Sequence, residues 1–265
     1  MNDTKRNWII TGGSRGIGRS LVDQVCAAGD SVVVLARGAT QEPWTCPDRV
    51  HEIGTDITDP DSIAAALDTA EETLGSIDVV VNCAGVHRGG RIEHLDRADW
   101  DTVLATNLTG TFDVCRLVVP RLGYGSTIIN VGAVVGFRGF PGDVAYGAAK
   151  AGLSGLTQVL AVELAPRGIR VNLVVPGFVD TDMTAGLSGR ARDKLVSSIP
   201  LRRNGNPKEI ADVIVNVANS TYMTGTTIPT DGGLLASFGS YSGETPLYEA
   251  TSRTAKVHDI AHTDS

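Results

Sequence analysis

Short runs of apolar, mostly β-branched residues recur along the chain, and segments with apolar residues at helical spacing lie between them. Such nearly continuous apolar runs are typical of parallel strands that are covered on both faces. Their alternation with helices predicts an α/β fold, a single doubly wound Rossmann-type domain with a parallel sheet of about seven strands and helices on both faces. The clearest predicted strands cover residues 8–10, 31–35, 77–81, 127–131 and 170–175.

Helical spacing is clearest over residues 19–28, 63–74 and 107–122. A further helix is expected to begin at Pro207, because proline fits the first helical turn. Residues 226–230 read as a last short strand, at the sheet edge because Pro229 has no N–H for a central ladder. From Phe238 onward the chain is polar and aperiodic, so the sequence predicts a domain over residues 1–237 and a C-terminal extension over 238–265.

Charge and hydropathy narrow the class of protein. The 265 residues carry a formal net charge of −7, and no run of five basic residues occurs, so the electrostatic signature of a nucleic-acid binder is absent. No apolar stretch reaches the roughly 18 residues of a membrane span, and the first six residues do not resemble a signal peptide. We expect a cytoplasmic protein whose partners include neither nucleic acid nor membrane.

Cysteines and histidines do not form a metal motif. Cys26, Cys46, Cys83 and Cys115 are widely separated, and we interpret them as small buried hydrophobic residues without disulfides. In the extension, His258 and His262 are spaced to share a helix face, but no third ligand is evident. No metal is expected.

A glycine-rich loop follows the first predicted strand and precedes a helix. It reads Thr11-Gly12-Gly13-Ser14-Arg15-Gly16-Ile17-Gly18. Glycines permit a tight turn and close approach of the backbone, and the following helix offers unpaired N–H groups to a pyrophosphate. The loop in this context indicates a dinucleotide site.

Further motifs follow in order. They are Asp56 after a threonine, the segment Asn82-Cys83-Ala84-Gly85, then Asn107, the pair Tyr146 and Lys150, and Pro176-Gly177 with Thr181. On these motifs and the glycine loop, over about residues 5–237, the chain is identified as a member of the short-chain dehydrogenase/reductase family. The resemblance implies a cofactor site made of Thr11, Gly12, Ser14, Arg15, Gly16, Ile17, Gly18, Arg37, Asp56, Ile57, Asn82, Ala84, Gly85, Tyr146, Lys150, Pro176, Gly177, Val179 and Thr181.

The second predicted strand decides which nicotinamide cofactor is expected. A site for NAD usually has an acid at the end of this strand, which binds the ribose 2′-hydroxyl, whereas here the strand ends Leu35-Ala36-Arg37. Arg15 and Arg37 are instead suited to clamp a 2′-phosphate. The sequence therefore predicts NADP(H).

The resemblance also implies the chemistry. Hydride passes to a carbonyl carbon while Tyr146 donates a proton to the carbonyl oxygen. Lys150, one helical turn later, is expected to lower the pKa of the phenol, which is near 10 when free, and to hold the cofactor ribose. Asn107 is expected to anchor a water that resupplies the proton. The four-residue spacing of Tyr146 and Lys150 differs from that of the family's enoyl reductases.

One expected group is missing, since Ala133 stands where the family carries a catalytic serine. Losing a hydrogen bond to the developing oxyanion costs about 10²- to 10³-fold in rate. Three explanations stay open. The substrate needs little polarisation, as for an imine, a quinone or a ketone with an internal hydrogen bond; the alanine is a deliberate replacement; or the chain is a weak or non-catalytic NADP-binding protein.

Substrate signals are few. Val134, Val135, Phe137 and Phe140 lie in the segment that should face the cleft, which favours an apolar or aromatic carbonyl substrate, and residues 182–203 are expected to form the substrate lid. The chain most resembles the 3-oxoacyl-(acyl-carrier-protein) reductase branch. One of that branch's two basic carrier-docking positions is Arg167, but the other is Tyr124, so a specialised ketoreductase is favoured over a reductase of fatty-acid synthesis.

Relatives in this family assemble through the helices that correspond to those containing Asn107 and Tyr146. The resemblance therefore implies a homotetramer, or a homodimer. The apolar residues expected on these helices are Val114, Leu117, Val118, Leu153, Leu156, Val159 and Leu160.

Overall fold

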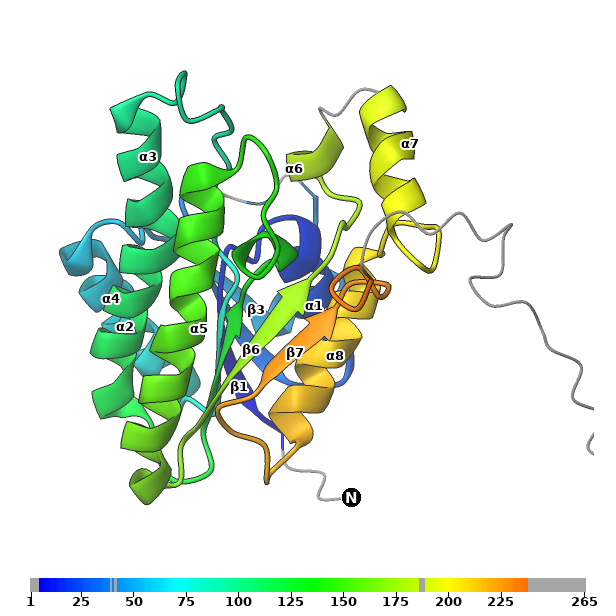
Figure 1. The fold of residues 1–265 in the computed structure, drawn as a ribbon. Helices are drawn as coiled ribbons and strands as arrows, with labels where there is room; N and C mark the ends of the chain where they lie inside the picture. The colour runs from blue at the N-terminus through cyan, green and yellow to red at the C-terminus, as the bar shows by residue number, and fades with distance from the viewer. Residues whose placement is uncertain (1–4, 39, 41, 186–188, 238–265) are drawn as a thin grey trace, which may run out of the picture.

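The computed structural model describes residues 5–38, 40, 42–185 and 189–237, and its centre is a parallel sheet of seven strands (Figure 1). The strand order is β3-β2-β1-β4-β5-β6-β7. Because the order runs outward in both directions from β1 and β4, the fold is doubly wound, as the sequence predicted. The strands are β1 Asn7–Thr11, β2 Ser31–Ala36, β3 Val50–Gly54, β4 Val79–Asn82, β5 Thr127–Val131, β6 Arg170–Pro176 and β7 Thr227–Thr230.

Helices cover both faces of the sheet (Figure 1). Side chains alternate along a strand, so Trp8 and Ile10 of β1 pack into one core with α1 and α8, while Ile9 packs into a second core with α2 and α4. The helices are α1 Gly16–Ala27, α2 Pro60–Leu74, α3 Arg97–Leu104, α4 Gly110–Val118, α5 Val144–Leu164, α6 Asp182–Ala185, α7 Gly189–Ser198 and α8 Pro207–Asn219.

Two element predictions are confirmed in detail. Helix α8 begins at Pro207, and Asn206 forms a capping box with Glu209. Strand β7 lies at the sheet edge, where Pro229 needs no donor on its outer side.

Two features differ in detail from the sequence analysis. Strand β3 had no clear signal in the sequence, because this edge strand exposes His51 and Glu52 and has no continuous apolar run. The segment over residues 107–122 is helical, as its spacing predicted, but it is not one continuous α-helix. A π-helical turn over Ala105–Thr109 joins α3 to α4, and a 3₁₀ turn over Val119–Arg121 ends the segment.

The cysteines follow the prediction only in part. Cys26 and Cys115 are buried, but Cys46 and Cys83 are half-buried, and no two of these four form a disulfide. Among the described residues, no cluster of three potential ligands could hold a metal ion. The extension, with His258 and His262, lies outside the described residues.

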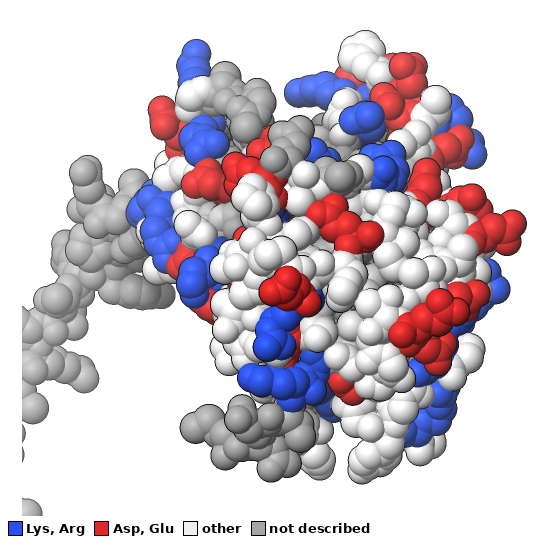
Figure 2. All heavy atoms as spheres, turned by 180° about the vertical axis from the view of Figure 1, so that it is seen from behind, with Lys and Arg blue, Asp and Glu red and all other residues white. Residues whose placement is uncertain are grey.

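The surface shows no single dominant charge on the face seen in Figure 2, where acidic and basic side chains are interspersed. Among the described helices, none is both long and apolar enough to cross a membrane.

Candidate active site

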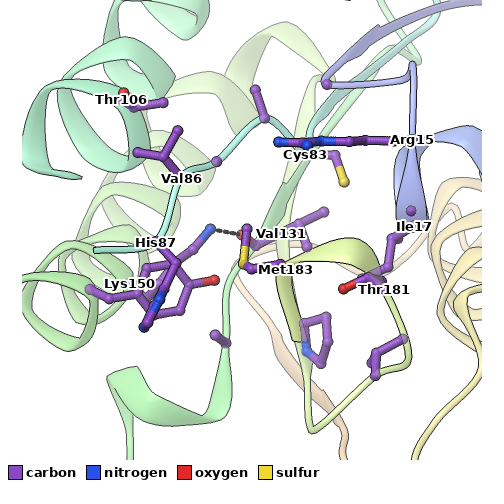
Figure 3. Close-up of a pocket in the computed structure, with 18 of the residues that line it drawn as sticks. Arg15, Ile17, Cys83, Val86, His87, Thr106, Val131, Lys150, Thr181 and Met183 are labelled. Atoms are coloured by element: carbon purple, nitrogen blue, oxygen red, sulfur yellow. Dashed lines mark hydrogen bonds between the residues drawn. The ribbon is translucent and has the colours of Figure 1, made fainter. Parts of the chain in front are cut away.

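A pocket of about 670 Å³ opens at the carboxyl ends of the central strands. Loops after β1 to β6 supply its walls, and α5 and α6 add further residues, among them Lys150 and Met183 (Figure 3). Parallel strands bring all these loops to one edge of the sheet, which is where doubly wound folds bind ligands.

The glycine-rich loop is packed too tightly for larger residues. Gly12 has φ +68°, and a Cβ there would lie 2.6 Å from Ala84 Cα, while one on Gly18 would lie 2.4 Å from Gly12 O. Thr11 Oγ1 accepts hydrogen bonds from the N–H groups of Cys83 and Ala84, which fastens the loop after β4 to the loop after β1. Arg15, at the N-cap of α1, leaves the helix N-terminus without a side-chain cap. The free N–H groups there suit a pyrophosphate.

Arg15 and Arg37 line one part of the pocket, and both are exposed. Within the described part of the chain, neither guanidinium makes an ion pair. Asp56 lies close to this part of the pocket, but its carboxylate accepts hydrogen bonds from Thr58 N and Oγ1, at 2.9 and 2.8 Å. These bonds, and to a lesser degree the charge of Arg37, hold the pKa of Asp56 below its usual value.

Tyr146 and Lys150 extend from α5 into the pocket. Lys150 is buried, its Nζ donates to Val131 O at 2.8 Å, and burial lowers its pKa to about 8 (Figure 3). Burial, and after it the charge of Asp143, raises the pKa of Tyr146. The expected lowering by Lys150 is therefore not seen, because the ammonium lies 5.6 Å from the phenol ring centroid and is bound to a carbonyl.

Asn107 is fully buried in the π-helical turn. Its Nδ2 donates to Val86 O and Val103 O, at 2.8 and 2.9 Å, and its Oδ1 accepts from Val86 N at 3.1 Å. Both Nδ2 hydrogens are therefore used within the protein, while Oδ1 and the main-chain carbonyl, which accepts from Thr111 Oγ1, each accept one hydrogen bond and keep a second lone pair. The side chain of Asn107 fixes the loop after β4.

Ala133 follows β5 and lines the pocket with its methyl group. Val134, Val135 and Phe140 also line it, as expected. The prediction for Phe137 was wrong, since this side chain is not in the pocket wall and is 43% exposed.

Most of the predicted cofactor residues meet in this pocket, but Thr11, Gly18 and Asn82 are buried behind its wall, as is Asn107, which was predicted as a catalytic residue. Asn82, for instance, is buried and donates to Asn130 Oδ1. The predicted residues in the wall are Gly12, Ser14, Arg15, Gly16, Ile17, Arg37, Asp56, Ile57, Ala84, Gly85, Tyr146, Lys150, Pro176, Gly177, Val179 and Thr181.

Sequence reasoning missed several wall residues. Their only signal was position, since His87 follows the Asn82–Gly85 motif and Asp143 stands three residues before Tyr146. The missed residues include Cys83, His87, Thr106, Asp143, Phe178 and Leu234.

Comparison with known proteins places the chain among reductases. The family model described as enoyl-(acyl carrier protein) reductase matches residues 12–235. The chain is 39% identical over 237 residues to the 3-oxoacyl-(acyl-carrier-protein) reductase FabG of Thermotoga maritima, covering 86% of this chain and 96% of that relative. It is 39% identical over 231 residues to carbonyl reductase family member 4 of Danio rerio, covering 85% and 96%.

Solved structures agree with these relatives. A dehydrogenase/reductase from Sinorhizobium meliloti superposes with a TM-score of 0.81 at 32% identity, over 86% of this chain and 94% of that one. Levodione reductase superposes with a TM-score of 0.82 at 29% identity, over 89% and 99%. With its glycine loop and its Tyr146–Lys150 pair, the chain belongs to the short-chain dehydrogenase/reductase family, oxidoreductases that act on carbonyl and alcohol groups.

Proposed function

We propose that this protein is an NADPH-dependent reductase that transfers hydride to the carbonyl carbon of an apolar or aromatic ketone or quinone, with Tyr146 as the proton donor. The observation that carries the proposal is one pocket containing both Tyr146 with Lys150 and the two unpaired arginines Arg15 and Arg37. The first pair supplies proton chemistry, and the second supplies charge for a phosphate.

The residues present fit NADP(H) better than NAD(H). A 2′-phosphate carries charge that two guanidiniums recognise well, and a 2′-hydroxyl calls for an acid that β2 does not provide. The uncapped N-terminus of α1 is positioned to bind the pyrophosphate, and Lys150 to bind the ribose. When bound, the nicotinamide supplies the hydride.

Tyr146 is suited to the direction of reduction. A raised pKa keeps its hydroxyl protonated at neutral pH, so it begins the reaction as an acid. Lys150 beside it carries a charge that stabilises the phenolate left after proton donation. We expect the ammonium to release Val131 O when the site fills.

The pocket walls favour an apolar substrate. Val134, Val135, Phe140 and Leu234 contribute hydrocarbon and aromatic surface, and Met183 reaches in from α6 (Figure 3). We propose residues 182–203 as the lid, since Met183, Thr184 and Leu195 of this segment line the same pocket.

A second candidate is a 3-oxoacyl-(acyl-carrier-protein) reductase, the activity that names several relatives. One observation weakens it. Arg167 Nη2 donates to Val119 O and Leu122 O, at 2.9 and 3.0 Å, so the remaining basic docking position is committed to its own backbone. The other position, Tyr124, is exposed and uncharged.

The experiment is cofactor binding followed by turnover. Fluorescence titration with NADPH and NADH should give at least 10-fold tighter binding of NADPH. NADPH oxidation is then measured with aromatic ketones, quinones, cyclic imines and a 3-oxoacyl thioester on a carrier protein. We expect the ketones or quinones to be reduced; turnover of only the carrier-bound thioester or only the imines would replace this proposal with that alternative.

A further inference from the structure

His87 and Asp143 form a pair in the wall of the candidate active site. His87 Nε2 lies 2.8 Å from Asp143 Oδ1, and their side chains are 35% and 16% exposed. The imidazole also packs edge-on against Tyr146, with ring centroids 5.2 Å apart. Figure 3 shows His87 in the same part of the pocket as Lys150. The pair therefore adjoins the proton donor.

The side chain of Asp143 bonds His87 and does not cap the helix that follows it. Asp143 stands at the N-cap of α5, where aspartate ordinarily accepts a backbone N–H, yet its side chain makes no cap hydrogen bond. The carboxylate bonds His87 instead. A capping bond to the helix that carries Tyr146 is replaced by a bond that orients an imidazole in the pocket.

Two further contacts fix the position of His87. Gly90 N donates to Gly142 O at 2.8 Å, which joins the loop after β4 to the loop before α5. Asn107 holds both the N–H and the C=O of Val86, the residue before His87. The imidazole is thus preorganised.

The pair leaves one ring nitrogen for a ligand. Asp143 accepts the proton of Nε2, and no described residue makes a hydrogen bond to Nδ1. In the neutral ring Nδ1 carries no proton, because the carboxylate keeps the proton on Nε2, whereas in the imidazolium Nδ1 is a donor. The hydrogen bond to Asp143 raises the pKa of His87, while partial burial and the charge of Arg88 oppose the rise. Tyr146 packs against the imidazole, and the pocket wall also contains the titratable side chains of Lys150, Cys83 and Asp182.

We propose that His87, held by Asp143, is a further catalytic residue that donates Nδ1–H to the substrate carbonyl oxygen, in place of the hydroxyl missing at Ala133. The inference rests on the proposed reductase function. His87 keeps its proton throughout, and the proton that reaches the oxygen comes from Tyr146. The substrate class that this donor serves is an ordinary ketone, which needs polarisation.

The test is a double-mutant cycle on kcat/KM for NADPH-dependent ketone reduction, using the chain, His87→Ala, Ala133→Ser and both together. If His87 stands in for serine, His87→Ala lowers kcat/KM about 100-fold in the chain and by less than about 5-fold in the Ala133→Ser background. An equal loss in both backgrounds, or no loss in the chain, overturns the proposal.

The pH profile separates donation from packing. For the chain, kcat/KM should fall as pH rises through the raised pKa of His87, because Nδ1–H is then lost. His87→Gln keeps an uncharged donor and should remove this fall, and Asp143→Asn should move it to lower pH. The matched control is His94→Ala, an exposed histidine of the same connection, which should change nothing. A fall that persists in His87→Gln contradicts the assignment.

NADPH binding, followed by fluorescence for every variant, distinguishes the two proposals. If all variants bind NADPH but neither the chain nor Ala133→Ser reduces any ketone, the reductase function fails and this inference with it. If only Ala133→Ser is active, the family chemistry holds but His87 does not replace serine. If the chain and His87→Ala are equally active, only this inference fails.

Discussion

Lys150 is a buried ammonium, and its burial lowers the free energy of unfolding because the charge is removed from water. Its pKa falls from 10.5 to about 8, so between these values the unfolded chain binds a proton that the folded chain has released. The free energy of unfolding therefore rises with pH between about 8 and 10.5. Below pH 8 the buried charge of Lys150 lowers this free energy most, compared with an uncharged side chain at the same position.

Lys150→Met should accordingly stabilise the protein at pH 7, by about 2 kcal/mol after allowing for the lost bond to Val131 O, while ketone reduction is abolished. Calorimetric unfolding at pH 7 and pH 9.5 measures the stability of the parent and of the variant. The stability gain of Lys150→Met over the parent should be smaller at pH 9.5 than at pH 7. The control is Lys208→Met, a change of an exposed side chain of α8, expected within about 0.5 kcal/mol of the parent. A Lys150→Met protein that is less stable at pH 7 contradicts this reasoning.

Arg37 governs the expected cofactor preference. Arg37→Asp replaces the guanidinium proposed to bind the 2′-phosphate with an acid at the end of β2, so Kd for NADPH should rise about 100-fold while Kd for NADH changes by less than about 3-fold. Fluorescence titration measures both. Arg91→Asp, an exposed change outside the pocket wall, is the charge-matched control. Equal weakening of both cofactors would mean that Arg37 does not contact the 2′-phosphate.

Among individual site residues, the sequence predicted those that lie within contiguous motifs and few others. Arg15, Tyr146 and Lys150 were found because their loop or helix spacing carries a meaning. His87 and Asp143 come together only through the parallel crossover that sets the loop after β4 beside the start of α5, and no local pattern encodes that meeting. The hydrogen bond from Lys150 to Val131 O could not be predicted from the sequence either.

Asn107, in the π-helical turn between α3 and α4, is expected to affect both the free energy of unfolding and the activity, because its side chain holds the loop after β4. Asn107→Ala would leave the N–H and C=O of Val86 without their partner, and we expect a loss of about 2 kcal/mol together with at least a 10-fold lower kcat. Urea unfolding and ketone reduction are the two measurements.

Asn206→Ala is the matched comparison, because it removes the cap of α8 on another part of the fold. It should cost about 1 kcal/mol and leave kcat unchanged. If both variants lose stability and neither loses kcat, Asn107 has a structural role alone.

Element predictions succeeded where burial imposes a pattern. The inner strands are buried on both faces, so their mostly apolar runs were clear, and Pro207 marked the start of α8. Strand β3 lies at the edge with an exposed outer row, and the π-helical turn continues the helical spacing of its neighbours. Neither feature changes the local pattern enough to be read from sequence.

For the whole molecule, α4 and α5 expose apolar side chains that a lone domain does not need. Val114, Val118 and Leu153, which the sequence suggested for an interface, are buried in the core. Of the suggested residues Val159 is exposed, at 56%, and it is joined by two that the sequence analysis did not name, Phe112 at 46% and Val162 at 76%. We expect this surface to join subunits of a homotetramer.

Light scattering tests the assembly. Phe112→Asp combined with Val162→Asp places charge in the expected interface and should yield a smaller species, with NADPH still bound. Ile92→Asp, at an equally exposed apolar position on the loop before α3, is the control and should not change the mass. A parent protein that already scatters as a monomer contradicts this expectation.

Hydride transfer from NADPH to a ketone, with Tyr146 as the acid, can be followed by deuterium labelling. The chain is incubated with NADPH deuterated at nicotinamide C4 and an aromatic ketone, and the alcohol is examined by mass spectrometry and NMR. We expect one deuterium at the carbinol carbon, and none for Tyr146→Phe although that variant still binds NADPH. NADPH consumption without deuterium in the alcohol, or undiminished transfer by Tyr146→Phe, would contradict this mechanism.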